Sequence, residues 1–137
     1  MVTMTACILI VEDNKANLAL VEYLLTAAGY RTLVATDGDE AVHLTRLHRP
    51  DLVLCDLQVP VLDGYEVLQQ LRNDPALSGL VVIAVTASTP GDGAYVLEAG
   101  FDGYLPKPIE PRAFVGQIEA YLRPQLRSRG PSGGTSS

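Results

Sequence analysis

The sequence predicts an α/β fold, a doubly wound parallel sheet of five strands with five helices. Short apolar runs alternate five times with amphipathic stretches, and this alternation is typical of repeated βαβ units. The first four apolar runs are continuous, so both faces of each strand are expected to be buried beneath helices. With right-handed crossovers, three helices cover one face of the sheet and two cover the other.

Each strand is expected where a short apolar run ends at a polar or turn-forming residue. The expected strands are residues 6–11, 32–35, 52–55, 81–86 and 104–105. The expected helices are one that follows Asp13 or Asn14 as N-cap and stops at Gly29, and residues 38–47, 65–73, 94–99 and 111–122. Pro111 suits the first position of the last helix, because its fixed φ is already helical.

Length and composition indicate one domain in a chain of 137 residues, 47% of them hydrophobic. We assign residues 6–123 to this domain and expect residues 124–137, which are rich in Gly and Ser, to form a disordered tail. A net charge of −6 argues against direct nucleic-acid binding. No apolar run approaches the roughly 20 residues of a membrane span, and the N-terminus does not resemble a signal peptide. We therefore expect a cytoplasmic protein without membrane contacts.

The two cysteines, Cys7 and Cys55, both lie inside apolar runs. We expect buried free thiols in a reducing compartment, close together on neighbouring strands inside the core. A metal or redox pair is disfavoured, because neither a CxxC motif nor a suitably spaced histidine accompanies them.

Polar side chains follow four of the expected strands. Glu12 and Asp13 follow the first strand, Asp56 the third, Thr86 ends the fourth and Lys107 follows the fifth. Each has an ordinary explanation by itself, such as a helix cap for the acidic pair or an Asx turn for Asp56. In an open parallel sheet, however, ligands bind at the carboxyl ends of the strands. The recurrence of polar residues at successive strand ends therefore favours one shared site.

The acidic residues of this set suit a magnesium ion. Mg²⁺ takes about six oxygen ligands at roughly 2.0–2.1 Å and keeps several waters. Asp13 and Asp56 can supply carboxylate oxygens, Glu12 a direct or water-mediated ligand, and a backbone carbonyl near Gln58 a further one. A bound cation would offset the repulsion among these carboxylates.

The remaining residues suit the transfer of a phosphoryl group. Asp56 can attack phosphorus as a carboxylate nucleophile, which gives an aspartyl phosphate. Lys107 balances the charge on the phosphoryl oxygens, and the Thr86 hydroxyl can donate a hydrogen bond to one of them. The combination predicts a phosphorylation switch.

Four motifs make the chain resemble the response-regulator receiver domains of two-component signalling, over about residues 6–122. The motifs are Ile8-Leu9-Ile10-Val11-Glu12-Asp13-Asn14, Asp56-Leu57-Gln58-Val59-Pro60-Val61-Leu62-Asp63-Gly64, Val85-Thr86-Ala87 and Tyr104-Leu105-Pro106-Lys107-Pro108-Ile109. The resemblance covers stand-alone receivers and those attached to hybrid kinases. It implies a flavodoxin-like sheet with strand order 2-1-3-4-5, and a cis Lys107–Pro108 bond.

The resemblance also implies a role for each site residue. Asp56 would be the phosphoacceptor, Glu12 and Asp13 the acidic metal pair, and Lys107 the phosphate-binding cation. Thr86 would be the switch hydroxyl and Tyr104 the switch aromatic, although a half-buried strand tyrosine is an equal alternative for the latter.

Partners follow from the same resemblance. The donor would be a phosphohistidine on a histidine kinase or a histidine phosphotransfer protein, and the output a downstream protein bound through the fourth helix, fifth strand and fifth helix. The donor is expected to dock against the first helix, at Lys15, Asn17, Leu18 and Val21, and against the Pro60 loop, although a core role is at least an equal alternative for Leu18. Self-phosphorylation and autodephosphorylation on Asp56 would be the only chemistry of this chain. Gln58 and Ser88 stand at positions that tune dephosphorylation in this family.

Three other functions fit these residues less well. An interaction module that signals without phosphate is disfavoured by the complete set of polar site residues. A Mg²⁺-dependent phosphohydrolase of the haloacid dehalogenase type would need a second carboxylate two residues past Asp56, where Gln58 stands. A flavodoxin-like cofactor binder would need a phosphate-cradling loop after the first strand, and the sequence has none there.

Overall fold

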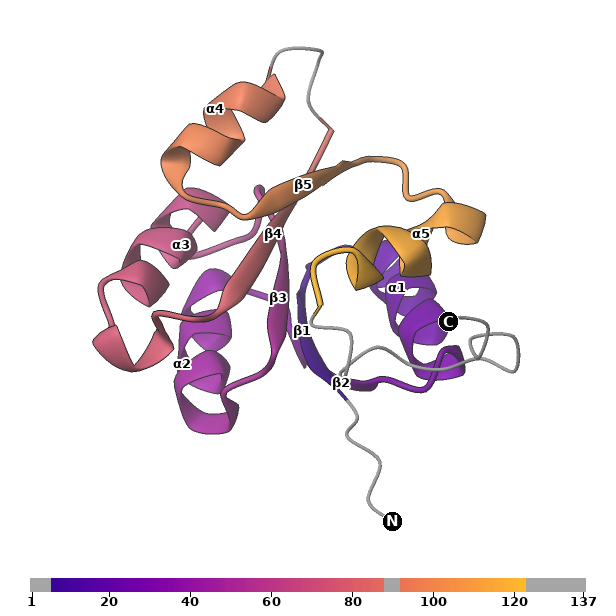
Figure 1. Ribbon diagram of the computed structural model, residues 1–137, viewed down its shortest axis with the longest axis horizontal. Helices are drawn as coiled ribbons and strands as arrows, with labels where there is room; N and C mark the ends of the chain where they lie inside the picture. The colour runs from indigo at the N-terminus through magenta and orange to yellow at the C-terminus, as the bar shows by residue number, and fades with distance from the viewer. Residues whose placement is uncertain (1–5, 88–91, 123–137) are drawn as a thin grey trace.

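The structure, a computed structural model, describes residues 6–87 and 92–122. Five parallel strands lie in the order β2-β1-β3-β4-β5 between two layers of helices (Figure 1). The strands are β1 (Cys7–Val11), β2 (Arg31–Ala35), β3 (Leu52–Asp56), β4 (Val81–Thr86) and β5 (Gly103–Pro106). The helices are α1 (Lys15–Ala27), α2 (Gly38–His48), α3 (Gly64–Arg72), the 3-10 turn η1 (Pro75–Leu77), α4 (Asp92–Ala99) and α5 (Pro111–Glu119). The predicted fold class and strand order are confirmed.

The two faces of the sheet carry separate cores, because successive strand residues point to opposite sides. On one face, Ile8 and Ile10 of β1 contact the buried side chains of α1 and α5. On the other face, Leu9 and Val11 belong to the core formed with α2, α3 and α4. The predicted division into three helices and two helices is therefore correct (Figure 1).

Most element bounds agree with the prediction to within one or two residues. The structure also decides which residue caps the first helix, and it shortens the last one. Asn14 is the N-cap of α1, since its side chain accepts from the Asn17 N–H at 2.9 Å. The last helix ends at Glu119 instead of residue 122. Leu122 is still buried, because a turn closed by its N–H and the Glu119 carbonyl carries it into the core.

The cysteines are free and buried, as predicted, but the expectation that they lie close together is wrong. Cys55 pairs with Val11 at one end of β1, whereas Cys7 lies at the other end. There its N–H donates to the Asp51 side chain at 2.8 Å. The parallel register decides this separation. Burial raises the pKa of both thiols, which keeps them protonated.

Some expectations fall on residues that the structure does not describe. These are the tail at residues 124–137 and Ser88. Among the described residues, no helix is long and apolar enough to cross a membrane.

Candidate functional site

The site lies at the carboxyl ends of the strands, where the chain order of the sheet reverses between β1 and β3. Asp56 is the last residue of β3, and Glu12 directly follows β1. The Glu12 N–H donates to the Ala35 carbonyl of β2 at 3.0 Å, so the chain beyond β1 continues the sheet before it turns into α1. Both carboxylates are buried, with 4% of Asp56 and 5% of Glu12 exposed. Buried carboxylates at a strand edge need partners.

The Asp56 carboxylate is held from two sides. Its Oδ1 accepts from the Gln58 backbone N–H at 2.9 Å, and its Oδ2 accepts from the Lys107 ammonium at 2.6 Å. The Lys107 Nζ also lies 3.6 Å from a Glu12 carboxylate oxygen. The other Glu12 oxygen accepts from the Asn14 backbone N–H at 3.0 Å. One ammonium therefore serves two buried carboxylates.

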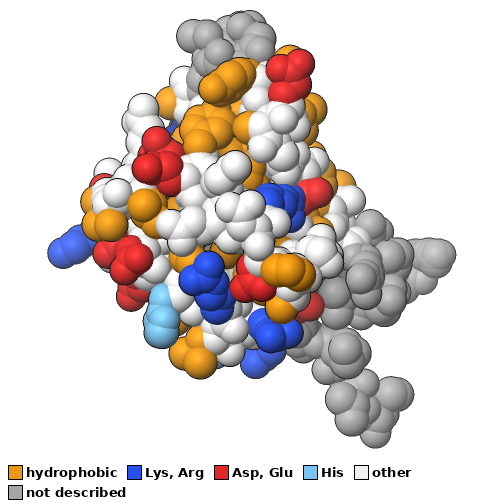
Figure 2. All heavy atoms as spheres, turned by 90° about the vertical axis from the view of Figure 1, so that its left-hand side faces the viewer, with side chains coloured by type: hydrophobic (Ala, Val, Ile, Leu, Met, Phe, Trp, Pro, Cys, Tyr) orange, Lys and Arg blue, Asp and Glu red, His pale blue; other side chains and the backbone are white. Residues whose placement is uncertain are grey.

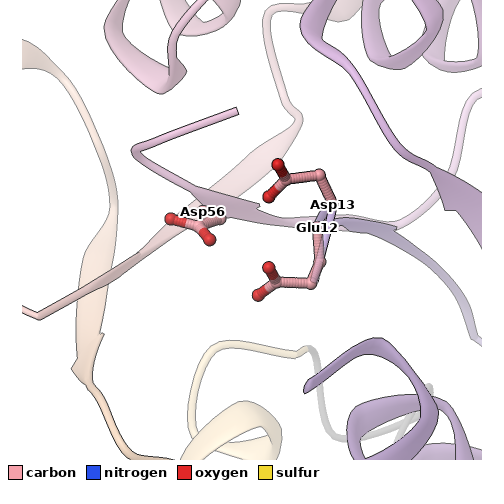
Figure 3. A group of neighbouring side chains, drawn as sticks. All are labelled: Glu12, Asp13 and Asp56. Carbon is pink, nitrogen blue, oxygen red and sulfur yellow. The ribbon is translucent and has the colours of Figure 1, made fainter. Parts of the chain in front are cut away.

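A third carboxylate, that of Asp13, joins this pair. One oxygen from each of Glu12, Asp13 and Asp56 lies within 4.8 Å of the others. Figure 3 shows Glu12 and Asp13 reaching from the end of β1 toward the side of Asp56 on β3. Carboxylate oxygens are the ligands that Mg²⁺ prefers, and three carboxylates beside one ammonium leave an excess of negative charge. The donor set therefore fits a divalent cation.

The pKa values of the neighbouring groups reflect this crowding. Burial raises the pKa of Glu12, and the charge of Asp56 adds to it, against the opposing effects of the Asn14 N–H and Lys107. Burial alone would lower the pKa of Lys107. The hydrogen bond and charge of Asp56, with the charge of Glu12, outweigh it and raise that pKa. Lys107 is therefore a full cation at neutral pH.

Asp56 opens onto a cleft of about 440 Å³, which Gln58, Thr86 and Lys107 also line. The Lys107 backbone N–H donates to the Thr86 carbonyl at 2.9 Å, and this bond fixes the chain after β5 against the end of β4. The Lys107–Pro108 bond is cis, as expected. A phosphoryl group that entered this cleft would meet the carboxylate, the hydroxyl and the ammonium together.

Tyr104 lies outside the group that lines this cleft. It points outward from β5, with 40% of the residue exposed. Its ring rests on the first turn of α4, so close that a Cβ added at Gly93 would lie 2.3 Å from the tyrosine hydroxyl oxygen. The predicted site residues thus meet in one place with the exception of Tyr104, which contacts α4 instead.

Sequence reasoning gave no part in the site to three residues that shape it. Asn14 holds Glu12 through its backbone N–H. Asp63 caps α3 in a reciprocal capping box with Glu66, and the Asp-x-x-Glu spacing could have revealed this. Gly38 contacts the loop after Asp56, and no local pattern indicates such a contact.

Comparisons with known proteins agree with this geometry. Residues 8–119 match the response regulator receiver domain family. The chain is 42% identical over 120 residues to the polar-differentiation response regulator DivK of Brucella ovis, a match that covers 87% of this chain and 98% of that protein.

Two solved structures are similar in fold. The receiver domain of sensor histidine kinase PA1611 from Pseudomonas aeruginosa, with a magnesium ion in its active site cleft, has a TM-score of 0.78 and 34% identity, over 85% of this chain and 97% of that one. The receiver domain of Ssk1, crystallised with the histidine phosphotransfer protein Ypd1 of Saccharomyces cerevisiae, has a TM-score of 0.79 and 30% identity, over 89% and 92%.

Proposed function

Because the chain belongs to the response regulator receiver domain family, we propose that it accepts a phosphoryl group on Asp56 in a Mg²⁺-dependent reaction. Receiver domains are signalling domains and not enzymes in the usual sense. We also propose that residues 6–123 form one receiver unit, whose only chemistry is self-phosphorylation and autodephosphorylation. Burial of both free thiols suits a cytoplasmic compartment, which we also propose.

The observation that carries the proposal is the 2.6 Å contact between the Lys107 ammonium and Asp56, beside the cluster of three carboxylates. Asp56 is buried except at the cleft, so a donor can approach its carboxylate from one side only. Gln58 N–H and Lys107 fix the carboxylate before a donor arrives. Such preorganisation is the main source of catalysis in phosphoryl transfer.

In the proposed step, an Asp56 carboxylate oxygen forms a bond to phosphorus while the bond from phosphorus to the donor imidazole nitrogen breaks. The imidazole nitrogen keeps the electron pair of the broken bond. Lys107 releases its contact with Asp56 in favour of the phosphoryl oxygens, and the Thr86 hydroxyl donates to one of them. Asp56 then carries an aspartyl phosphate.

The magnesium ligands in this proposal are Glu12, Asp13, Asp56 and the backbone carbonyl of Gln58. A bound Mg²⁺ supplies positive charge that offsets repulsion between the carboxylates and the incoming phosphoryl group. The magnesium in the related PA1611 receiver supports this assignment. The clustering of the three carboxylate oxygens supports it independently.

We propose a histidine kinase or a histidine phosphotransfer protein as the donor, in line with the Ypd1–Ssk1 complex. Its docking surface would be α1 near Leu18 together with the loop at Pro60. Pro60 and Val61 are both exposed beside the cleft, with 73% of Val61 accessible. Apolar side chains beside the phosphoacceptor suit contact with a partner helix.

The output is proposed to pass to a downstream protein through α4, β5 and α5. Hydrophobic side chains gather on the face that Figure 2 shows, at the height of α4. The exposed apolar residues of α4 include Tyr95 and Leu97. Phosphorylation would draw Thr86 toward the phosphoryl oxygens and let Tyr104 turn inward, which shifts a pre-existing equilibrium of this face.

Intact mass after incubation with Mg²⁺ and acetyl phosphate tests the proposal. We expect one phosphoryl adduct that hydroxylamine removes, and no adduct on Asp56→Asn. Asp63→Asn is the matched control, because asparagine keeps the α3 cap and Asp63 also borders the cleft. An adduct that survives in Asp56→Asn would refute the assignment. No adduct on the wild type, even from a phosphohistidine donor, would favour a module that signals without phosphate.

The switch has its own test. Thr86→Ala should still accept the phosphoryl group, while amide chemical shifts of α4 and β5 change less on phosphorylation than in the wild type. Equal shift changes in both proteins would contradict the role given to Thr86.

A further inference from the structure

We propose that Gly38, at the start of α2, is a positioning residue that holds the loop after Asp56 in the shape needed to bind Mg²⁺. The proposal rests on the magnesium site proposed above and extends it to an element that contributes no ligand. No side chain is present at Gly38 to touch the carboxylates. Its effect passes through the backbone of residues 58–62.

The loop contains a strained turn. The Leu62 N–H donates to the Pro60 carbonyl at 2.9 Å, which closes a three-residue γ-turn around Val61. Val61 has φ +73°, a left-handed conformation that β-branched residues avoid. Such a turn persists only where the surrounding structure enforces it.

Gly38 supplies that enforcement. Its N–H donates to the same Pro60 carbonyl at 3.0 Å, so this oxygen accepts one bond from within the turn and one from the start of α2. A Cβ at Gly38 would lie 2.2 Å from the Leu62 carbonyl oxygen and 2.5 Å from the Leu62 Cβ. Because the closest of these atoms belongs to the backbone, an alanine could fit only if the loop moved.

Movement of the loop reaches the site within a few residues. Gln58 carries the proposed metal-binding carbonyl, and its N–H holds Asp56 Oδ1 at 2.9 Å. At the far end of the loop, the Gly64 N–H donates to the Leu57 carbonyl at 3.0 Å, and a Cβ at Gly64 would lie 2.8 Å from Leu57 Cα. The loop is therefore closed at its base by the Gly64 hydrogen bond, and Gly38 at the start of α2 packs closely against its Leu62 end. Because the loop is short and closed at both ends, a shift of the Leu62 backbone should also move the backbone of Gln58.

The first experiment compares Mg²⁺ affinity, measured calorimetrically, in wild type, Gly38→Ala, Gly116→Ala and Ile118→Ala. Removal of an outer partner of a metal ligand costs about 10- to 100-fold in affinity, and we expect Gly38→Ala to bind Mg²⁺ at least about tenfold more weakly. Gly116→Ala places a methyl group where no atom lies within 4 Å and should bind normally. Ile118→Ala loosens the core on the opposite face of the sheet and should also bind normally. Normal Mg²⁺ affinity in Gly38→Ala would overturn the proposal.

A second measurement needs no metal. Amide hydrogen exchange at Gln58 and Leu62 should be faster in Gly38→Ala than in Ile118→Ala, although the latter is also destabilised. Equal exchange at these two amides would contradict a positioning role. If the wild type bound no Mg²⁺, the proposed function would fail, and this comparison would still decide the role of Gly38.

A third experiment compares a separate pair of variants and serves if Gly38→Ala does not fold. The Asp37 side chain caps α2 by accepting from the Glu40 N–H at 2.8 Å. Asp37→Ala frees the first turn of α2 with no added bulk, whereas Asp37→Asn removes the same charge and keeps a capping group. We expect Mg²⁺ affinity to be several-fold weaker in Asp37→Ala than in Asp37→Asn. Equal affinities would refute control of the loop by α2.

Discussion

The two edges of the sheet both hold carboxylates, but they use them in opposite ways. At the edge where β4 begins, Asp102 accepts from the Val82 N–H and from Arg72, each at 2.8 Å, and Arg72 also donates to the Leu80 and Gly100 carbonyls. At the edge where β3 ends, Glu12, Asp13 and Asp56 face one another beside a single ammonium, that of Lys107.

The two edges differ in how far neighbouring donors and cations balance the charge of the carboxylates. At the first edge the Asp102 carboxylate accepts from a backbone N–H and a guanidinium, so the contacts fasten segments of the chain together. At the second edge three carboxylates face one ammonium, so the folded protein keeps repulsion that a bound cation can relieve. Loss of a group should therefore cost stability at the first edge and ligand binding at the second.

The largest expected effect is the stabilisation by Mg²⁺. At a concentration 100 times the dissociation constant, Mg²⁺ should add about 2.7 kcal/mol to the free energy of unfolding. Asp13 is exposed, so Asp13→Asn should leave the metal-free stability within about 0.5 kcal/mol while it removes most of this increment. Denaturant titrations with and without Mg²⁺ measure both values. An increment that Asp13→Asn leaves unchanged would exclude Asp13 as a ligand.

The next effect is expected at the other edge. Arg72→Ala should lower the free energy of unfolding by roughly 2 kcal/mol, because it removes the donor to two carbonyls and one of the two donors to Asp102. Arg46→Ala is the matched control. The Arg46 pair with Asp74 spans 3.5 Å, and 51% of its side chain is exposed, so its loss should cost no more than about 0.5 kcal/mol. Mg²⁺ affinity should be normal in both variants, and a loss in Arg72→Ala would undo the division between the edges.

The pH dependence of the site gives a smaller effect with a definite sign. The pKa of Glu12 is raised in the folded protein, so its protonation begins at a higher pH than for an ordinary glutamate. Mg²⁺ needs the carboxylate, and affinity should therefore fall as pH falls toward this pKa, by at most about tenfold per pH unit for one proton. In the metal-free protein the sign is opposite: the stability contribution of Glu12 is fully present at low pH and is lost as pH rises through the folded pKa.

Calorimetric Mg²⁺ titrations between neutral and mildly acidic pH test this sign. Glu12→Gln should bind more weakly at neutral pH and show a flatter dependence on pH. If Mg²⁺ affinity changed equally with pH in the wild type and in Glu12→Gln, the proton that competes with Mg²⁺ would belong to another group.

The smallest effect concerns two left-handed residues, one near each edge. Val61 has φ +73° beside the site, and Arg49 has φ +49° after α2, before β3 begins. Asparagine tolerates this conformation better than either residue. Val61→Asn should raise the free energy of unfolding by about 1 kcal/mol and Arg49→Asn by less, since valine is β-branched. Denaturation midpoints measure both gains, and a larger gain at Arg49 would contradict strain at Val61.

Several of these features were predictable from local sequence. Continuous apolar runs predicted buried parallel strands, and a polar residue after each of four strands predicted a common site. The parallel arrangement places all carboxyl ends at one edge, so Glu12, Asp13, Asp56, Thr86 and Lys107 had to be neighbours once the sheet formed. The helix layers followed from the same alternation together with right-handed crossovers, whereas the strand order was implied by the resemblance to receiver domains.

Other features depend on distances between segments that no local pattern encodes. The register of β1 and β3 separates Cys7 from Cys55, and the Tyr104 ring can rest on α4 because Gly93 has no side chain there. The close contact of Gly38 with the loop after Asp56 brings two distant segments together, and it is possible because glycine has no side chain. The sequence by itself determined which chemical groups reach the edge of the sheet, because strand polarity is a local property. Tertiary structure alone decided how closely those groups are held, because packing distances arise only when all the elements meet.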